Sequence, residues 1–534
     1  MPPRREAWIG AFALVGVAFL VTRVALLIRF PPFVDEALYA RWAWAGLDDP
    51  GSRFISLANG KEPLLPWLGT VFMWLGFEPL TAVRLVSVLA GALTLTCTAL
   101  IARELGGRRA ALSAAALYVV IPFVFVHDAI GIYDPLATAA VTAALLLEIR
   151  LARGGGVGVT LLLGLAFAAG FLTKQTTYVS FALAPVSLLL LTEGSDRGRR
   201  VSKWLAGNGI ALGIGLACYS VLRFSEHYDD LARLRRLIYP VHSVGETLAS
   251  PIFWIEHNWP LYQDALVGYL TVPVLLLLAL GAGLSLRRVP RLATLLATWG
   301  LVPLIVAVLL ADDPFPRFLL TGIPPLVALA GYGTAAALER LSAWAPRRWS
   351  LAAGAVAAVL AVAPAVVFDV NVLSHPATVS YPGLDDVQYA TGWASGGPWP
   401  KLADELRSRA VHERTTVLMG EHGSTALELL LRHEPTLAVV GEADGTTRFG
   451  VENSVELPDP AGAVTWRELA RYDRPRGGDP LVLLERGVVV ENVFVTTPDE
   501  LREQLGVDDA GFDAFLGARQ DIGDWYREWY EARS

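Results

Sequence analysis

The chain has 534 residues, of which 54% are hydrophobic and 18% are charged, whereas soluble proteins carry about a quarter charged residues. Residues 1–370 hold 29 Lys and Arg against 23 Asp and Glu, a net charge of +6. Residues 371–534 hold 15 against 28, a net charge of −13, and the two parts sum to −7. We therefore expect a polytopic membrane domain over 1–370 followed by an acidic soluble domain over 371–534, and the acidic tail argues against nucleic-acid binding.

The first part of the chain is a series of apolar runs. A membrane-spanning helix needs about 20 apolar residues. About eleven runs are long enough, near 7–29, 82–103, 110–126, 133–149, 157–173, 176–192, 204–222, 264–286, 292–311, 317–338 and 350–370. The first run is too long for the apolar part of a signal peptide, so we expect it to be retained as a span. The two cysteines, Cys97 and Cys218, lie in apolar runs and have no metal-ligand spacing.

A shorter apolar run, 64–77, carries Pro66, Trp67 and Trp74. Runs of this length are often interfacial, and Trp prefers the headgroup level. If this run lies flat on the membrane, the compact basic clusters between the spans all fall on one side, which the positive-inside rule makes cytoplasmic. We therefore predict a cytoplasmic N-terminus, an extracytoplasmic C-terminal domain and two long outer loops, 30–81 and 223–263.

The same topology brings many of the polar residues to one membrane boundary. At the outer face we expect Asp35, Glu36, Lys61, His127, Asp128, Asp134, Lys174, His242, Asp312, Asp313 and Arg317. Arg23 lies within the first span, and we expect its side chain to extend outward to the interface. This gathering of charge predicts a site at the outer membrane face.

The acidic tail alternates between helical and strand patterns. We expect strands at Thr415–Met419, Leu437–Val440, Leu481–Leu484 and Val488–Phe494, and helices at Lys401–Arg409, Thr425–Arg432, Thr465–Arg471 and Asp513–Arg533. Such alternation predicts a small α/β domain.

Several motifs in the first 400 residues occur in the order found in one known family. They are Asp35-Glu36-Ala37-Leu38-Tyr39, Lys61-Glu62-Pro63-Leu64-Leu65-Pro66-Trp67, Arg84-Leu85-Val86-Ser87, Tyr133-Asp134-Pro135-Leu136, Pro316-Arg317-Phe318-Leu319-Leu320, and Val387-Gln388-Tyr389 with Gly392-Trp393. Together they resemble the polyprenyl-phosphate-dependent glycosyltransferases of the GT-C fold, which include the protein O-mannosyltransferases and the lipid A aminoarabinose transferases. The resemblance implies an all-α membrane domain that transfers a hexosyl or pentosyl unit, with inversion, at the outer face of the cytoplasmic membrane.

The resemblance also implies partners and an acid for the reaction. The donor would be a polyprenyl-phosphate-linked sugar, held among membrane lipids, and the acceptor a lipid, a glycan or a protein. Asp35 matches the acid expected to take the proton of the acceptor, while Glu36 could be that base instead or a solvated neighbour. Without the resemblance, Asp35 could simply cap a helix after Pro31-Pro32.

Three cations are candidates for contact with the donor phosphate: Lys61 matches a lysine that contacts the donor phosphate in this family, Lys174 resembles the lysine of a Leu-Thr-Lys turn in relatives, and Arg317 is suited to bidentate phosphate contact. A fixed cation would stabilise the negative charge that the leaving phosphate gains. Each has an alternative, because Lys61 could face lipid headgroups, Lys174 could be a solvated turn residue, and Arg317 could be an anchor paired with Asp312 and Asp313.

Two further acidic sites remain open. Asp134 could position substrate, assist a metal or cap a helix. His127 and Asp128 replace a stretch that often contains Arg in the family, so we assign them only to a possible second-loop site. Carboxylate and imidazole groups suit several metals, and a divalent ion held by these residues with Asp35 is possible, but the sequence leaves the metal unknown.

Two other classes of function compete with a transferase. A transporter or flippase would carry ionisable residues near the centres of its spans, whereas most spans here are plain Leu, Ala and Val. A non-catalytic assembly or sensor protein would leave the ordered motifs unexplained. The sugar, the acceptor and the oligomeric state cannot be read from these residues.

Overall fold

The structure is a computed structural model that describes residues 5–191, 196–238, 244–344, 350–409, 415–420, 423–457, 464–490 and 493–531. The chain divides into two compact units. The first comprises Met1–Phe30, Tyr39–Pro376 and Tyr381–Asp385, and the second comprises Pro31–Leu38, Ala377–Ser380 and Asp386–Ser534. His242, which we expected at the outer boundary, lies outside the described residues.

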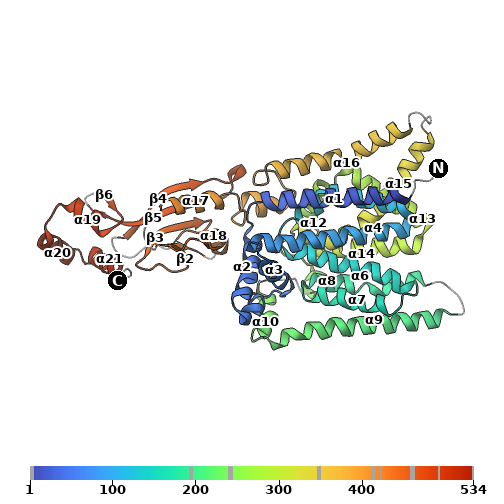
Figure 1. The fold of residues 1–534 in the computed structure, drawn as a ribbon, viewed down its shortest axis with the longest axis horizontal. Helices are drawn as coiled ribbons and strands as arrows, with labels where there is room; N and C mark the ends of the chain where they lie inside the picture. Colours follow the sequence, from blue (N-terminus) through green and yellow to red (C-terminus); the bar gives the residue numbers. More distant parts are fainter. Residues whose placement is uncertain are drawn as a thin grey trace. The chain divides into compact units, whose positions relative to one another are not determined.

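The first unit is helical. Its α-helices are α1 (Arg5–Arg29), most of α2 (Val34–Asp48), α3 (Leu64–Trp74), α4 (Pro79–Val120), α5 (Pro122–His127), α6 (Tyr133–Ala152), α7 (Val157–Phe171), α8 (Thr176–Phe181), α9 (Arg197–Tyr219), α10 (Tyr228–Ile238), α11 (Val244–Ala249), α12 (Pro251–Leu270), α13 (Val272–Arg288), α14 (Pro290–Leu310), α15 (Ile323–Trp344) and α16 (Ser350–Ser374). Short 3₁₀ segments are η1 (Pro50–Asn59), η2 (Ala184–Leu190), η3 (Ser220–Phe224) and η4 (Pro316–Gly322). In Figure 1, α1, α4, α6, α7 and α9 lie roughly parallel, each packed against the next.

Among the described residues, seven helices are long and apolar enough to cross a membrane, or eight if the bent pair α12–α13 forms one span. All eleven expected runs coincide with helical segments, but they do not all form separate long helices. The element α4 (42 residues) contains the run 82–103 and most of the run 110–126, and its backbone leaves the helical region between them, at Gly106 and Gly107. The expected runs 157–173 and 176–192 form the shorter apolar helices Val157–Phe171 and Thr176–Leu190. The chain is thus a multi-pass membrane protein, and the flat placement of 64–77 stays a prediction.

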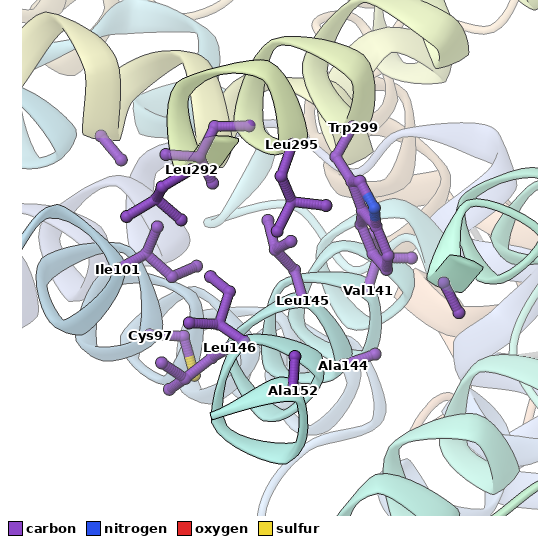
Figure 2. Packing of buried hydrophobic residues seen from close by; sticks show 14 of the residues in the cluster. Cys97, Ile101, Val141, Ala144, Leu145, Leu146, Ala152, Leu292, Leu295 and Trp299 are labelled. Atoms are coloured by element: carbon purple, nitrogen blue, oxygen red, sulfur yellow. The ribbon is translucent and has the colours of Figure 1, made fainter. Parts of the chain in front are cut away.

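The core of the helical unit is built from small and branched apolar side chains. Figure 2 shows Leu292, Leu295 and Trp299 of α14 directed toward Val141 and Leu145 of α6, within a larger buried cluster that includes residues of α4. The backbones of α13 and α15 lie in direct contact. A Cβ added at Gly333 of α15 would lie 2.2 Å from the Leu277 carbonyl oxygen of α13. Small residues allow such close packing where lipid provides no hydrophobic driving force.

Arg23 does not extend to the interface as we expected. Its side chain is fully buried. Nη1 donates to the Val119 carbonyl at 2.8 Å, and the guanidinium lies over the rings of Phe19 and Phe125. The prediction failed because the end of α4 offers two carbonyl oxygens inside the bundle, which accept hydrogen bonds from Nη1 and Nη2.

The second unit contains a mixed six-stranded sheet with the order β2-β1-β3-β5-β4, and β6 pairs with β5. The strands are β1 (Thr415–Met419), β2 (Leu437–Val440), β3 (Thr447–Asn453), β4 (Val464–Tyr472), β5 (Leu481–Val490) and β6 (Val493–Val495). β1 pairs in parallel with β2 and β3, while β3, β5, β4 and β6 form antiparallel pairs. Its helical segments are the π-helix η5 (Val387–Thr391), α17 (Trp399–Arg409), α18 (Ser424–Leu431), η6 (Pro475–Gly477), α19 (Pro498–Leu505), α20 (Asp509–Ala518) and α21 (Gln520–Glu531).

Three sequence predictions for this unit were wrong in detail. The segment 465–471, expected as a helix, is strand β4, because its pairing with β5 from Val464↔Val488 to Tyr472↔Leu481 overrides a weak local pattern. Strand β3 was missed, and the two expected strands over 481–494 are mainly one long strand, β5. The expected helix 513–533 is two helices, α20 and α21, separated at Arg519, and its last residues lie outside the described part.

Candidate functional site

The centre of the candidate site is an ion pair at the start of α6. Lys174 Nζ donates to Asp134 Oδ1 at 2.6 Å, and the two side chains are 17% and 8% exposed. Asp134 lies in the first turn of α6, where a carboxylate is favoured by the helix dipole. Lys174 lies in the turn between α7 and α8. A buried pair of this kind keeps a cation in a fixed position beside an acid.

Lys61 is brought toward this pair by the segment that precedes α3. Gly60 adopts a positive φ of 70° and ends η1, a conformation for which glycine is the least costly residue. The next residues are tied down by two bonds: Tyr133 Oη donates to the Glu62 carbonyl at 2.8 Å, and Leu64 N donates to the Leu172 carbonyl at 3.0 Å. Both bonds join the 61–64 segment to neighbours of Asp134 and Lys174.

Arg317 reaches the same cluster from η4. Its guanidinium lies 5.0 Å from the Phe315 ring centroid, and Lys174 Nζ lies 4.7 Å from the ring centroid of Phe318. Burial lowers the pKa of Lys174 below its usual value. The negative charge of Asp134 opposes this decrease, whereas the positive charges of Arg317 and Lys61 add to it. Three cations therefore interact around one acid, and the site has an excess of positive charge that suits a phosphate.

His127 also lies near Asp134 and has contacts of its own. Nδ1 lies 2.7 Å from the Phe123 carbonyl oxygen, and Nε2 lies 3.2 Å from Asp385 Oδ2. Tyr269 Oη donates to the same Asp385 oxygen at 2.6 Å. Both ring nitrogens thus face acceptors, an arrangement that suits a doubly protonated imidazolium. The charge of His127 also interacts with that of Asp134.

Asp128, although adjacent to His127, belongs to a different cluster. It is 1% exposed, and its charge interacts with Arg23. A Cβ at Gly91 of α4 would lie 2.5 Å from Asp128 Cγ, so the carboxyl group is packed directly against that helix. Asp369 of α16 is also buried and interacts with Arg23. His127 and Asp128 thus have different nearest charged groups, Asp385 and Arg23, and their assignment to one site stays a prediction.

Asp35 and Glu36 lie in the first turn of α2, within the short stretch that groups with the second unit. Glu36 is fully buried, and its Oε1 accepts from Phe33 N at 2.9 Å, as an acid at the third helical position does in a capping box. Asp35 is half-buried. It lies one helical turn before Tyr39, on the same side of α2, and the Tyr39 ring packs edge-on against Tyr133 at 4.7 Å between centroids. Glu36 therefore has a structural role at the start of α2.

Three residues of these clusters were not singled out from the sequence: Tyr269, Asp369 and Asp385. Asp369 is an acid within an apolar run, a signal that could have drawn attention to it. Nothing in the local sequence marks Tyr269 or Asp385 as partners of His127. Within the described residues, no three His, Cys, Asp or Glu side chains come together as a group that could hold a metal ion.

Comparison with known proteins relates the chain to membrane glycosyltransferases. Residues 60–222 match the family of dolichyl-phosphate-mannose-protein mannosyltransferases. No curated protein matches the sequence. The structure is similar to that of ArnT from Cupriavidus metallidurans in the apo state, with 15% sequence identity and a TM-score of 0.55, over 90% of this chain and 98% of that chain.

Two further structures show the same fold. ArnT from Cupriavidus metallidurans bound to undecaprenyl phosphate matches with 16% identity and a TM-score of 0.53, again over 90% of this chain and 98% of that chain. The apo oligosaccharyltransferase of Archaeoglobus fulgidus matches with 11% identity and a TM-score of 0.51, over 84% of this chain and 70% of that chain. The fold expected from the motifs is confirmed: the chain has the GT-C fold of polyprenyl-phosphate-dependent glycosyltransferases.

Proposed function

We propose that the chain is an integral membrane glycosyltransferase that moves a sugar from a polyprenyl-phosphate donor to a lipid, glycan or protein acceptor at the outer face of the cytoplasmic membrane. The observation that carries the proposal is the cluster of Lys174, Arg317 and Lys61 around Asp134. Cations fixed by packing stabilise the phosphate as it gains charge, without reorganisation at the moment of reaction. The GT-C fold and the family match over residues 60–222 support the same class.

The proposed reaction is an inverting displacement. The acceptor oxygen or nitrogen forms a bond to the anomeric carbon, while the bond from that carbon to the phosphate oxygen breaks. Asp35 accepts the proton that the acceptor loses, and the polyprenyl phosphate leaves with its negative charge balanced by the three cations. The transition state resembles an oxocarbenium ion, so a nearby carboxylate also lowers its energy. Asp134 fixes Lys174 and so positions the donor.

The test is sugar transfer in membranes that contain a labelled polyprenyl-phosphate-sugar pool, with the native chain and the variant Asp35→Asn at matched expression. We expect transfer by the native chain and a loss of at least a hundredfold in the variant, since general bases contribute about 10²–10⁴-fold. The control is Asp48→Asn at the other end of α2. Full activity of Asp35→Asn would exclude it as the base.

A second candidate, a transporter or flippase, is favoured by one observation. Arg23 of α1, Glu148 of α6 and Asp369 of α16 are ionisable side chains buried within helices long enough to span a membrane, whereas the sequence predicted spans that are mostly plain Leu, Ala and Val. Glu148 Oε2 on α6 accepts from Ser187 and from Trp204 Nε1, both at 3.0 Å. Movement of the lipid-linked sugar across vesicles by a chain that transfers no sugar would favour this class.

The outer location of the site is tested separately by labelling engineered cysteines from outside intact cells. Residue 61 should react with an impermeant maleimide, and residue 200, close to the start of α9, should not. The natural Cys97 is buried, and Cys218 is replaced by Ser as a precaution. Equal labelling of the two positions would overturn the proposed sidedness.

A further inference from the structure

The short segment that leads into α2 groups with the second unit, although its neighbours in the sequence on both sides belong to the helical unit. It contains Asp35, the acid proposed as the base. The two prolines at its start have no backbone N–H, and the N–H of Phe33 donates to Glu36 within the same segment. The N–H of Val34 donates to the Ala394 carbonyl at 3.2 Å. The backbone next to Asp35 is therefore held by a residue that is distant in the sequence.

Two further contacts seat this segment on residues 389–396. The carbonyl oxygen of Pro32 packs directly against Gly396, because a Cβ added at Gly396 would overlap with that oxygen. The rings of Phe33 and Tyr389 pack edge to face with 5.2 Å between their centroids, and both side chains are 1% exposed. Such close packing leaves the segment little room to shift.

Arg474, in the loop between β4 and β5, fixes the residues around Ala394. Its side chain is 3% exposed. Nε donates to Ser395 Oγ at 2.8 Å, and Nη2 donates to the Trp393 carbonyl at 3.2 Å and to Asn453 Oδ1 at 2.9 Å. Nη1 donates to a carbonyl oxygen of its own loop. The guanidinium thus binds both residues that flank Ala394.

An arginine suits this position because its N–H donors lie in one rigid plane, whereas a lysine carries a single ammonium group. Asn453, the last residue of β3, adds a second bond, since its Nδ2 donates to the Trp393 carbonyl at 3.1 Å. The sheet of the second unit is therefore connected through Trp393 and its neighbours to the backbone beside Asp35.

We propose that Arg474 is a positioning residue for sugar transfer: through residues 393–396 it holds Asp35 where the carboxylate can take the proton of the acceptor. A displacement of about 1 Å by a change far from the chemistry can cost about 10²-fold in rate, so the second unit is a required part of the enzyme. The role of Arg474 rests on the proposed function, in which Asp35 is the base.

The experiment measures kcat, and KM for the labelled lipid-linked donor, with the full-length chain in detergent. Arg474→Lys keeps the charge but cannot form all of these bonds, and we expect kcat to fall about tenfold or more. KM should stay within about twofold of the native value, because the cations proposed to bind the phosphate belong to the helical unit.

The same substitution is then made in the Asp35→Asn variant. If Arg474 acts through Asp35, Arg474→Lys should cause no further loss of kcat there, since the effects of residues that act as a unit are not additive. A native kcat in Arg474→Lys alone would overturn the proposal. An equal fold-loss in both backgrounds would also overturn it, because it would indicate a general structural defect.

Gly396→Ala gives a test that leaves Arg474 intact and applies even if Arg474→Lys fails to fold. The added Cβ must displace the Pro32 carbonyl, so kcat should fall by about 10²-fold with KM unchanged. The control is Gly441→Ala in the same unit, where a Cβ meets no atom within 4 Å, and it should keep the native kcat. Equal kcat values in the two variants would contradict the proposal.

The proposed function and the role of Arg474 can fail separately. Full activity of Asp35→Asn would remove the proposed base, whatever Arg474 does. Loss of transfer in Asp35→Asn together with a native kcat in Gly396→Ala would refute the positioning role alone.

Discussion

His127 Nε2 lies 3.2 Å from Asp385 Oδ2, and both side chains are fully buried. Asp385 comes from the end of the helical unit, 258 positions further along the chain than His127. His127 Nδ1 also lies 2.7 Å from the Phe123 carbonyl oxygen, and Tyr269 Oη donates to Asp385 Oδ2, so these contacts join α5, α12 and the segment that follows α16. A protonated His127 would place a positive charge next to the cluster around Asp134.

The free energy of unfolding should therefore depend strongly on Asp385, the partner of His127. Asp385→Asn leaves the buried imidazolium without a counter-ion, and loss of one partner of a buried pair costs about 3–5 kcal/mol. The double variant His127→Gln/Asp385→Asn should lose less, because no buried charge is left unbalanced. Thermal unfolding of the purified single and double variants in detergent measures the difference in stability. A double variant no more stable than Asp385→Asn would show that His127 is neutral.

Removal of the Lys174 ammonium should affect the reaction more than the fold. Lys174→Gln deletes the cation nearest to Asp134, and we expect kcat for sugar transfer to fall by about 10²-fold or more, as loss of a preorganised electrostatic group does elsewhere. Lys174→Arg keeps the charge and should retain part of the activity. Transfer by Lys174→Gln at the native rate would show that the phosphate does not contact this residue.

The same lysine predicts a limit at alkaline pH. Burial lowers the pKa of Lys174, so the ammonium loses its proton at a lower pH than an ordinary lysine, whose pKa is about 10.4. Below that pKa the cation is present, and above it the donor phosphate loses a partner, so transfer should decrease as pH rises. The pH–rate profile of Lys174→Arg should extend further into the alkaline range, because arginine keeps its charge. Coincident profiles would contradict this assignment.

Substitutions of Glu36 and of Asp35 should have different effects on sugar transfer. Its carboxylate accepts from Phe33 N at 2.9 Å and is fully buried, and the amide oxygen of Gln can accept the same bond. We therefore expect Glu36→Gln to retain sugar transfer, and Glu36→Ala to lose about 1–2 kcal/mol of stability through the missing cap. If a folded Glu36→Gln variant no longer transfers sugar, Glu36 would be the base instead of Asp35.

Gly91 provides a sharp test of the packing around Asp128. Alanine normally favours a helix over glycine by about 1 kcal/mol, but a Cβ at Gly91 would lie 2.5 Å from Asp128 Cγ. Gly91→Ala should therefore lower the free energy of unfolding by about 1–3 kcal/mol, as overpacking does. Gly10→Ala is the control, since a Cβ there meets no atom within 4 Å. Thermal unfolding in detergent should separate the two, and equal midpoints would contradict the packing.

Asp444 should make the second unit sensitive to acid. Its Oδ1 accepts from Thr446 N at 2.8 Å and from the hydroxyls of Thr416 and Thr447 at 3.0 and 3.1 Å. Burial raises the pKa of Asp444, but these bonds outweigh it and lower the pKa below its usual value. The stabilisation is thus present above the unfolded pKa, near 3.9, and is lost as pH falls through the lower folded value.

Resistance to pepsin provides the measurement for Asp444. At pH 5 the native chain should resist cleavage between β1 and β3 better than Asp444→Asn, and the difference should shrink as the pH is lowered toward 2 and the native carboxyl group takes up its proton. The native chain and Asp444→Asn are compared at the same pH, so the effect of pH on the activity of pepsin cancels. A difference of the same size at both pH values would show that the charge of Asp444 contributes nothing.

The sequence by itself determined the broad architecture and the candidate residues. Apolar length marked the helical segments, because a membrane span must satisfy its backbone internally, and the motifs around Asp35, Lys61, Asp134 and Arg317 indicated the GT-C fold. These signals are local, so they can be read along the chain. The local pattern predicted a helix at 465–471, which was wrong, because this segment is strand β4 and its conformation depends on pairing with β5.

Only the tertiary structure decided which charges meet. It paired Lys174 with Asp134, and it placed His127 beside Asp385 and Asp128 near Arg23. It also turned Arg23 into the bundle, where backbone carbonyls accept its hydrogen bonds. A buried charge persists only where distant groups compensate it, and the positions of those groups follow from helix packing rather than from any spacing in the sequence.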